Sequence, residues 1–323
     1  MPPLPEPQQH TIDAIYSAYQ ARREDGERTY LGMSAFGTGC DRALWYGFRW
    51  AHSPEQLDGR KVRLFATGER EEERLVADLR LAGVEIEDRD PATGEQWEVF
   101  GLGGHLRGHM DGRGLGFLEV PATVHLIEFK THNDKSFKAL VKDGVARSKP
   151  GHFAQMQLYM HFGGLARAFY LAHNKNTDEL HAERIAYDPV AAARLVARAS
   201  AIIESVRPPA KLHADPTAKA AYACGWCPAK GICHEREWSR VNCRTCLHVT
   251  PLTDGSDGSW HCERFDRLLS TEEQRQGCPA HRFIPDLVPG EQVDADVAAE
   301  TVTYRLADGT AWIDGVTWNE ARP

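Results

Sequence analysis

The eight cysteines of this chain constrain its fold more than any other feature of the sequence. Seven of them lie within 55 residues in the last third of the chain, and the eighth, Cys40, stands far upstream. The first residues, MPPLPEPQQH, contain neither a basic nor an apolar segment and do not resemble a secretion signal. We therefore expect a cytoplasmic protein, and in that reducing compartment clustered cysteines bind metal more often than they form disulfides.

One set of four cysteines has the spacing of a zinc site. Cys243 and Cys246 form a C-x2-C step, and Cys262 and Cys278 follow after two gaps of 15 residues. Two thiolates from such a step and two later ones can give Zn²⁺ its tetrahedral ligands. Three nearby histidines could replace one of the four, namely His248, His261 and His281. We expect a zinc-ribbon-like module over residues 239–285 that braces the protein or contacts a protein partner.

The other set joins the distant cysteine to a tight cluster. Cys224, Cys227 and Cys233 lie within ten residues, and Cys40 is the cysteine left to complete the set. Four thiolates from separate parts of a chain can hold an iron–sulfur cluster, and zinc could use the same ligands. A link from Cys40 to Cys224 closes a loop of about 184 residues. Metal binding would then stabilise whatever folds inside that loop.

The pattern of helices and strands before the cysteine cluster predicts an α/β fold. Periodicity and turn residues predict helices at 11–24, 41–48, 61–82, 134–143, 151–162 and 188–206. Strands are predicted at 95–101, 104–111, 124–130, 166–173 and 179–186. Helices that alternate with short strands favour a mixed central sheet flanked by helices. No stretch approaches the ~18 apolar residues of a membrane span.

One predicted strand carries charges that a buried strand normally lacks. Glu128 and Lys130 stand two residues apart, so both side chains point from one face of the strand. They are costly there unless they pair with each other, which is the structural alternative, or bind a ligand. Asp111 ends a preceding strand and can lie beside Glu128, and two carboxylates with a backbone carbonyl suit Mg²⁺ or Mn²⁺. Such an ion would activate water and neutralise phosphate charge, with Lys130 stabilising the transition state.

Two helical segments add polar groups near this strand. Gln155 and Tyr159 are four residues apart and share one helical face, where they could contact a phosphate and the next nucleotide. Gly68 is followed by a run of acidic residues from Glu69 to Glu73, one of which could face the metal. Taken alone, each pattern is typical of an ordinary amphipathic helix with a solvated face.

Together these motifs resemble a known nuclease family. The series Gly108-x2-Asp111, Glu128-x-Lys130 and Gln155-x3-Tyr159, with one cysteine before it and C-x2-C-x5-C after it, is similar to the RecB-like branch of the PD-(D/E)XK nucleases. Within that branch it resembles the iron–sulfur exonucleases, including the CRISPR-associated ones, and phage exonucleases of similar core. The resemblance covers about residues 30–235. It implies a restriction-endonuclease-like fold and a place in DNA recombination or repair.

The resemblance also implies roles for individual residues. Asp111 and Glu128 would bind the divalent metal, Lys130 would be catalytic, and Gln155 and Tyr159 would line the substrate channel. Many relatives carry a histidine after the glycine of the first helix, where this chain has the acidic run. We assign the equivalent metal ligand to Glu72, with Glu69 and Glu73 as alternatives. The 4Fe–4S cluster would be held by Cys40, Cys224, Cys227 and Cys233.

The net charge of −8 is unevenly distributed along the chain. Residues 286–323 carry eight acidic and two basic side chains, a net charge of −6, and predict a hairpin from Val302–Leu306 and Ala311–Val316. Residues 130–149 carry six basic and two acidic side chains, a net charge of +4. A local basic stretch is sufficient for phosphate contacts, although it is equally typical of an exposed helix. Its candidate DNA-binding residues are Lys135, Lys138, Lys142, Arg147 and Lys149.

We therefore expect a divalent-metal-dependent DNA nuclease, more narrowly an exonuclease that acts on single strands or duplex ends. Its nuclease core with the iron–sulfur clasp would span 1–238, followed by the zinc-ribbon-like module at 239–285 and an acidic hairpin and tail at 286–323. One alternative is a non-catalytic iron–sulfur or zinc nucleic-acid-binding module. The others are an endonuclease of the same fold and an electron-transfer protein. The resemblance to phage enzymes allows a phage-encoded protein in the host cytoplasm.

Overall fold

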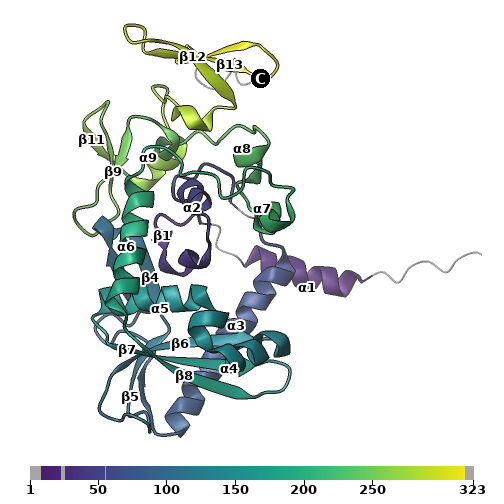
Figure 1. Ribbon diagram of the computed structural model, residues 1–323, viewed down its shortest axis with the longest axis vertical. Coiled ribbons are helices and arrows are strands. Elements are labelled where there is room, and N and C mark those ends of the chain that lie inside the picture. Colours follow the sequence, from purple (N-terminus) through teal and green to yellow (C-terminus); the bar gives the residue numbers. More distant parts are fainter. Residues whose placement is uncertain (1–8, 23–25, 55, 317–323) are drawn as a thin grey trace, which may run out of the picture.

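The structure is a computed structural model that describes residues 9–22, 26–54 and 56–316. It is elongated, with a large α/β body at one end and a small antiparallel sheet at the other (Figure 1). The first eight residues, and Glu320 and Arg322 of the predicted acidic tail, lie outside the described residues. Within the described ranges, no helix has both the length and the apolar character needed to cross a membrane.

The body is built on a mixed five-stranded sheet with the strand order β2-β5-β6-β7-β8. β6 and β7 pair in parallel along their whole length, from Leu126 opposite Ala168 to His132 opposite Asn174. The other neighbours in this sheet pair antiparallel. The prediction of a mixed central sheet is therefore confirmed. The strands are β2 (Glu85–Glu87), β5 (Gly112–Leu115), β6 (His125–His132), β7 (Arg167–Asn174) and β8 (Leu180–Ala186).

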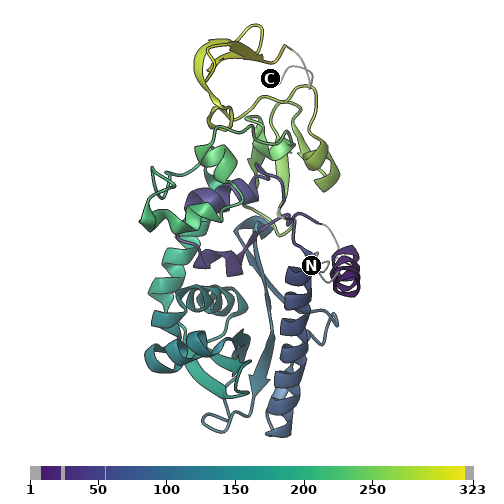
Figure 2. The same cartoon turned by 90° about the vertical axis from the view of Figure 1, so that its right-hand side faces the viewer.

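Helices cover both faces of this sheet, as Figure 2 shows. The long helix α3 packs Leu75 and Val76 against Ile127 and Phe129, which point from one face of β6. The other face lies against α4 and α5 and buries Leu126, and α6 packs on α5. Acceptor side chains cap α3, α4 and α6 at their N-termini and satisfy amides that have no intrahelical partner. The helices are α1 (His10–Ala21), α2 (Asp41–Phe48), α3 (Gly59–Leu81), α4 (Asp134–Ser148), α5 (Pro150–Gly163) and α6 (Pro189–Glu204).

A second, smaller sheet continues from the first. Its strands have the order β1-β4-β3, with β1 (Leu31–Gly32), β3 (Trp97–Gly101) and β4 (Leu106–Met110). Asp111 is the single residue between β4 and β5, so the chain passes from the small sheet into the large one at this aspartate. The sequence predicts β4 but not β5, because the strand Gly112–Leu115 is short and half glycine.

The cysteine-rich region and the C-terminal sheet complete the fold. Three short strands, β9 (Val249–Pro251), β10 (Trp260–Cys262) and β11 (Arg267–Leu269), form an antiparallel sheet that is followed by α9 (Thr271–Gln276). The predicted hairpin is present as β13 (Thr301–Leu306) and β14 (Ala311–Asp314). A third strand, β12 (Gly290–Asp296), pairs with β13 and corrects the expectation of two strands. Its exposed acidic sequence lacks the apolar alternation that would predict a strand.

One apolar core runs through the predicted boundary between residues 238 and 239. Trp45 of α2 and Leu106 of β4 belong to the same buried cluster as Trp260 of the ribbon. Phe283 and Tyr304 extend this cluster into the C-terminal sheet. The ribbon-like module therefore shares its core with the α/β body.

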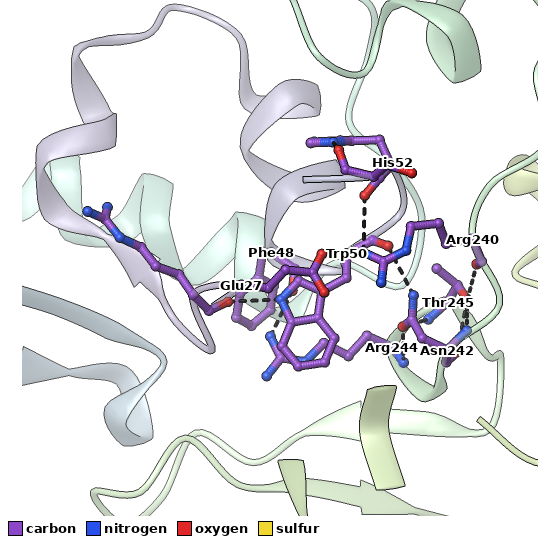
Figure 3. Close-up of polar contacts among 10 residues, drawn as sticks. Glu27, Phe48, Trp50, His52, Arg240, Asn242, Arg244 and Thr245 are labelled. Carbon is purple, nitrogen blue, oxygen red and sulfur yellow. Dashed lines mark hydrogen bonds and ion pairs between the residues drawn. The ribbon is translucent and has the colours of Figure 1, made fainter. Parts of the chain in front are cut away.

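Two buried arginines hold this junction together. Arg244, of which 1% is exposed, donates from Nη1 to the carbonyl oxygen of Phe48 at 3.0 Å and from Nε to Gln274 Oε1 at 2.9 Å. Its guanidinium carbon lies 3.6 Å from the centroid of the Trp50 ring. Arg49, also buried, donates to the carbonyl oxygen of Arg244 at 3.1 Å. Figure 3 shows Arg244 between the segment around Trp50 and the loop that carries Asn242 and Thr245.

The Arg244→Ala substitution is expected to lower the free energy of unfolding by about 3–4 kcal/mol, because it opens a cavity and leaves two buried acceptors unpaired. Denaturant-induced unfolding measures the loss. Arg275→Ala is the matched control, because the Arg275 guanidinium lies 5.6 Å from the same Trp50 ring but is half-exposed. It is expected to cost less than about 1 kcal/mol. Equal unfolding midpoints for the two variants would contradict a role for Arg244 at this junction.

Candidate active site

The candidate site is built on β6, whose two faces differ in chemistry. Ile127 and Phe129 point toward α3 and are buried in apolar surroundings. Glu128, Lys130 and His132 alternate with them and point toward α5, because successive strand residues face opposite sides. Glu128 is fully buried, so this strand places a carboxylate in the interior of the protein.

Asp111 lies beside Glu128 because of the bend between β4 and β5. Its Oδ2 accepts a hydrogen bond from the backbone N–H of Phe129 at 2.8 Å. The Asp111 carboxylate thus accepts the hydrogen bond that a backbone carbonyl of a neighbouring strand would otherwise accept from Phe129, at the point where β5 diverges from β6. Burial raises the pKa of Asp111, and the Lys130 ammonium partly opposes this rise. The structure therefore brings together the two carboxylates that the sequence predicted as a pair.

Lys130 forms an ion pair with Glu128 and also donates to the carbonyl oxygen of Phe129 at 3.0 Å. Burial alone would lower the pKa of Lys130, but Glu128 and Asp111 outweigh it and raise the pKa above its usual value. Lys130 is therefore a cation at neutral pH. From this position the Lys130 ammonium could neutralise a negative charge that develops near the two carboxylates.

Glu72 is the residue of the acidic run that reaches the site. α3 continues without a break through Gly68, and Glu69 and Glu73 on it are exposed. Burial and the nearby Asp111 carboxylate raise the pKa of Glu72 to about 7, against the opposing effect of Lys130. Glu71 contacts His173 instead, at 3.3 Å between Oε2 and Nδ1. The preference for Glu72 over Glu69 and Glu73 agrees with this placement.

The carboxylates of this site are the oxygen donors that a hard divalent cation prefers. Glu128 Oε2 is buried and has no hydrogen-bond partner among the described residues. The pKa of Glu128 is raised to about 7, because burial and the Asp111 carboxylate together outweigh the lowering by Lys130. Three carboxylates thus share one ammonium, an excess of negative charge that Mg²⁺ or Mn²⁺ would relieve. In the described part of the chain, however, no three His, Cys, Asp or Glu side chains are arranged to hold a metal ion, so metal binding here is a proposal.

Gln155 and Tyr159 of α5 contact each other beside the carboxylates. Gln155 Nε2 donates to the Tyr159 hydroxyl at 3.1 Å, and both side chains are buried. Burial and the nearby Glu128 carboxylate raise the pKa of Tyr159. The glycine three residues before Asp111 makes this arrangement possible, because a Cβ at Gly108 would overlap the Tyr159 ring.

The basic stretch after β6 is only partly available for phosphate contacts. Lys138 Nζ is held by Asp134 Oδ2 at 2.8 Å, one turn earlier on α4. Helical geometry on α4 is interrupted at Gly144, where φ is 72° and the chain approaches Glu183. Lys149 is close enough to His132 and His152 to help lower the pKa of both. Lys135, Lys142 and Arg147 are exposed, and so is Lys138 despite its ion pair.

Three residues that the sequence analysis did not select lie in the same site. The hydroxyl of Tyr170 on β7 contacts His132 Nε2 at 2.9 Å and His152 Nδ1 at 2.9 Å. His132 continues the alternation of Glu128 and Lys130, and His152 lies three residues before Gln155 on α5. Periodicity could have indicated both histidines. Tyr170 could be identified only from the strand register, which places it opposite Glu128.

The two cysteine sets each converge in the structure. Cys227 lies between the short helices α7 (Tyr222–Gly225) and α8 (Lys230–His234). Burial raises the pKa of Cys227, and the thiolates of Cys40, Cys233 and Cys224 add to the rise. Burial and its three partners, Cys278, Cys246 and Cys262, likewise raise the pKa of Cys243 to about 12. The second set lines one small cavity: Cys243, Cys246, Cys262 and Cys278.

Because the pKa values of Glu72 and Glu128 are raised, we expect Mg²⁺ to stabilise the folded protein to an extent that depends on pH. Without metal, the pKa values of about 7 for Glu72 and Glu128 mean that the folded state holds protons more tightly than the unfolded state. These groups therefore destabilise the metal-free protein increasingly as pH rises from their unfolded pKa toward 7. Mg²⁺ binds the ionised carboxylates and opposes this loss.

Thermal unfolding with and without millimolar Mg²⁺ checks this prediction. We expect the Mg²⁺-induced rise in Tm to grow from near zero at about pH 5.5 to roughly 2–4 °C at about pH 8. The difference between the two samples removes other effects of pH on stability. Glu128→Gln should abolish the growth, and an equal Tm shift at both pH values in the wild type would contradict the prediction.

Comparison with known proteins relates this chain to a family of nucleases. A family model described as the PD-(D/E)XK nuclease superfamily matches residues 24–234. The crystal structure of SSO0001 is similar with a TM-score of 0.40 and 15% identity, covering 69% of this chain and 96% of that chain. The alkaline exonuclease LHK-Exo from Laribacter hongkongensis is similar with a TM-score of 0.38 and 14% identity, covering 58% of this chain and 90% of that chain. No curated protein matches the sequence.

Proposed function

Since this chain belongs to the PD-(D/E)XK nuclease superfamily, we propose that it is a divalent-metal-dependent DNA nuclease and, more narrowly, an exonuclease. One observation supports this most strongly. The fully buried Glu128 leaves Oε2 without a partner among the residues that the structure describes, while Asp111 and Lys130 flank it. A purely structural Glu–Lys pair would not need the second carboxylate and would not leave a buried oxygen unsatisfied.

We propose that Asp111, Glu128 and Glu72 hold the ion, together with the carbonyl oxygen of Phe129. Mg²⁺ or Mn²⁺ in this place supplies charge neutralisation for the scissile phosphate and lowers the pKa of water. Lys130 stabilises the negative charge that develops on the phosphate, because it remains protonated and its position is fixed by Glu128. Gln155 and Tyr159 shape the wall of the site that faces the substrate.

The basic residues beside the site would contact the DNA backbone. We propose that Lys149 lies closest to the scissile phosphate and that the exposed residues on α4 extend the contact along the strand. Lys138 would have to exchange its bond with Asp134 for a phosphate. Such contacts are independent of sequence and weaken with added salt.

We propose that the two cysteine sets hold a 4Fe–4S cluster and a Zn²⁺ ion. In the first set, thiolates that would repel one another come from two distant segments, around Cys40 and from Cys224 to Cys233. A cluster at this place would tie α2 to the segment after α6. In the second set a zinc ion would fix the ribbon, and its shared core with the α/β body favours bracing as the purpose of the module.

The test is the degradation of end-labelled linear DNA and of covalently closed circular DNA in Mg²⁺ or Mn²⁺. We expect the linear DNA to be degraded and the closed circle to remain intact. Cleavage of the closed circle would replace the exonuclease with an endonuclease. The absence of any degradation by the wild type would refute the nuclease. Equal degradation by the wild type, Lys130→Ala and Asp111→Ala would show that the reaction takes place elsewhere.

A further inference from the structure

Beside the carboxylates, four side chains form a continuous hydrogen-bonded chain. Ser136 Oγ lies 3.1 Å from His132 Nδ1, and His132 Nε2 lies 2.9 Å from the hydroxyl of Tyr170. The same hydroxyl lies 2.9 Å from His152 Nδ1. Tyr170 and His132 are buried, whereas His152 is partly exposed. The chain therefore leads from the protein interior to a ring that solvent can reach.

This hydrogen-bonded chain belongs to the site by position. His132 shares a face of β6 with Glu128 and Lys130, and Tyr170 is the residue opposite Glu128 on β7. His152 comes from α5, three residues before Gln155. The Lys130 ammonium is close enough to help lower the pKa of both histidines.

With both rings neutral, the hydrogens of this chain can be arranged in two concerted ways, which differ in whether the Tyr170 hydroxyl donates to His152 or to His132. Burial, together with Lys149 and Lys130, lowers the pKa of His132 to about 4, and burial and Lys130 lower that of His152 to about 3. A neutral imidazole carries one N–H, and the hydroxyl of Tyr170 carries one hydrogen. If Tyr170 donates to His152 Nδ1, then His132 Nε2 donates to Tyr170 and Ser136 donates to His132 Nδ1. His152 Nε2 then carries an N–H.

That nitrogen is free to meet a ligand. Within the described residues, His152 Nε2 has no hydrogen-bond partner, and it is not among the buried unpartnered atoms. Phosphate oxygens accept hydrogen bonds and do not donate them, so a bound phosphodiester would select the tautomer that presents Nε2–H. A neutral donor also contacts phosphate without adding a third cation next to Lys130 and Lys149.

We propose that His152 contacts a phosphate oxygen of the substrate strand through Nε2–H, and that Tyr170 and His132 are positioning residues that fix its tautomer. This role rests on the proposed nuclease activity. The contact is present when substrate binds and persists in the transition state, so its loss raises KM and leaves kcat unchanged. That signature differs from the loss of Lys130 or of a metal ligand, which lowers kcat.

The test compares steady-state hydrolysis of labelled DNA by Tyr170→Phe, His152→Gln and the double variant. Phenylalanine keeps the ring and removes the hydroxyl, so KM is expected to rise about tenfold with kcat within about twofold of wild type. The glutamine amide can donate from a place near Nε2 without help from Tyr170. Adding Tyr170→Phe to His152→Gln is therefore expected to change KM no further.

Tyr187→Phe is the matched control, because the Tyr187 hydroxyl bonds His161 Nδ1 at 2.7 Å near the other end of α5. It removes the same kind of contact away from the site and is expected to leave KM unchanged. An unchanged KM for Tyr170→Phe would overturn the proposal, as would a KM effect that simply adds to that of His152→Gln or a fall in kcat alone. If the wild type itself does not hydrolyse DNA, the nuclease proposal fails first.

Discussion

Replacing Lys130 with alanine is expected to lower kcat for metal-dependent DNA hydrolysis by about a thousandfold, with KM little changed. Lys130 pairs with the buried Glu128 and is the ammonium nearest both carboxylates. Removing one preorganised group that stabilises transition-state charge typically costs 10²–10³-fold in rate. A loss in kcat alone identifies an interaction made in the transition state and not in the ground state.

Replacing the carboxylates Asp111 and Glu72 with their amides tests the same site, because each amide keeps the shape of the side chain and removes only its charge. Asp111→Asn keeps an oxygen that can accept from the Phe129 N–H but removes the negative charge. We expect it to reduce activity at least as strongly as Lys130→Ala and to abolish the Mg²⁺-induced rise in Tm. Glu72→Gln should act in the same direction, because Glu72 is partly buried beside Asp111.

Glu73→Gln is the control for the carboxylate variants, since Glu73 follows Glu72 on α3 and is exposed. It is expected to retain activity within about twofold of wild type. If Glu73→Gln and Glu72→Gln lose activity equally, the assignment of Glu72 as a ligand is wrong. If Lys130→Ala and Asp111→Asn retain wild-type kcat while folded, the site on β6 does not carry the reaction.

The second large effect is expected from the first cysteine set. Protein purified without oxygen is expected to be brown, and Cys227→Ser is expected to lose the colour and about 5 kcal/mol of unfolding free energy. The magnitude follows from the loop that the cluster closes. A cross-link that closes a loop of 100 residues or more lowers the entropy of the unfolded chain, which stabilises the folded state by about 5 kcal/mol at 25 °C. Visible absorption, metal analysis and denaturant-induced unfolding together measure the effect.

Trp226→Ala is the control for that variant. Trp226 precedes Cys227 in the chain and is 88% exposed, so its loss should change neither colour nor stability. A colourless wild type with about two zinc ions per chain would replace the iron–sulfur cluster with a second zinc site. A fully folded and active apoprotein would refute a structural role for either metal at this set.

Much of the site could be predicted because its chemistry conflicts with its local surroundings. Glu128 and Lys130 interrupt an otherwise apolar strand, and that conflict indicates a pair or a ligand without any knowledge of the fold. The spacing of Gln155 and Tyr159 places them on one helical face in the same way. What the sequence could not show is that these two contact each other, and that Gly108 makes room for the Tyr159 ring.

The remaining parts of the site depend on contacts between distant segments. Tyr170 has no local signal, and only the parallel register of β6 and β7 places it opposite Glu128 and within reach of two histidines. β2 and β5 are too short and too polar to be read from periodicity. The union of the ribbon with the body depends on Arg244 packing on Trp50, across nearly two hundred residues.

The sequence by itself determined the mixed α/β class, the order of the nuclease motifs and the grouping of the cysteines into two sets of four. These properties follow from side-chain periodicity and from ligand spacing, which are local. Only the tertiary structure decided which acidic residue of α3 meets Asp111, how Tyr170 joins His132 to His152, and that one core unites the body with the ribbon. Strand register and helix packing set these relations, because they bring together side chains whose separation along the chain carries no periodic signal.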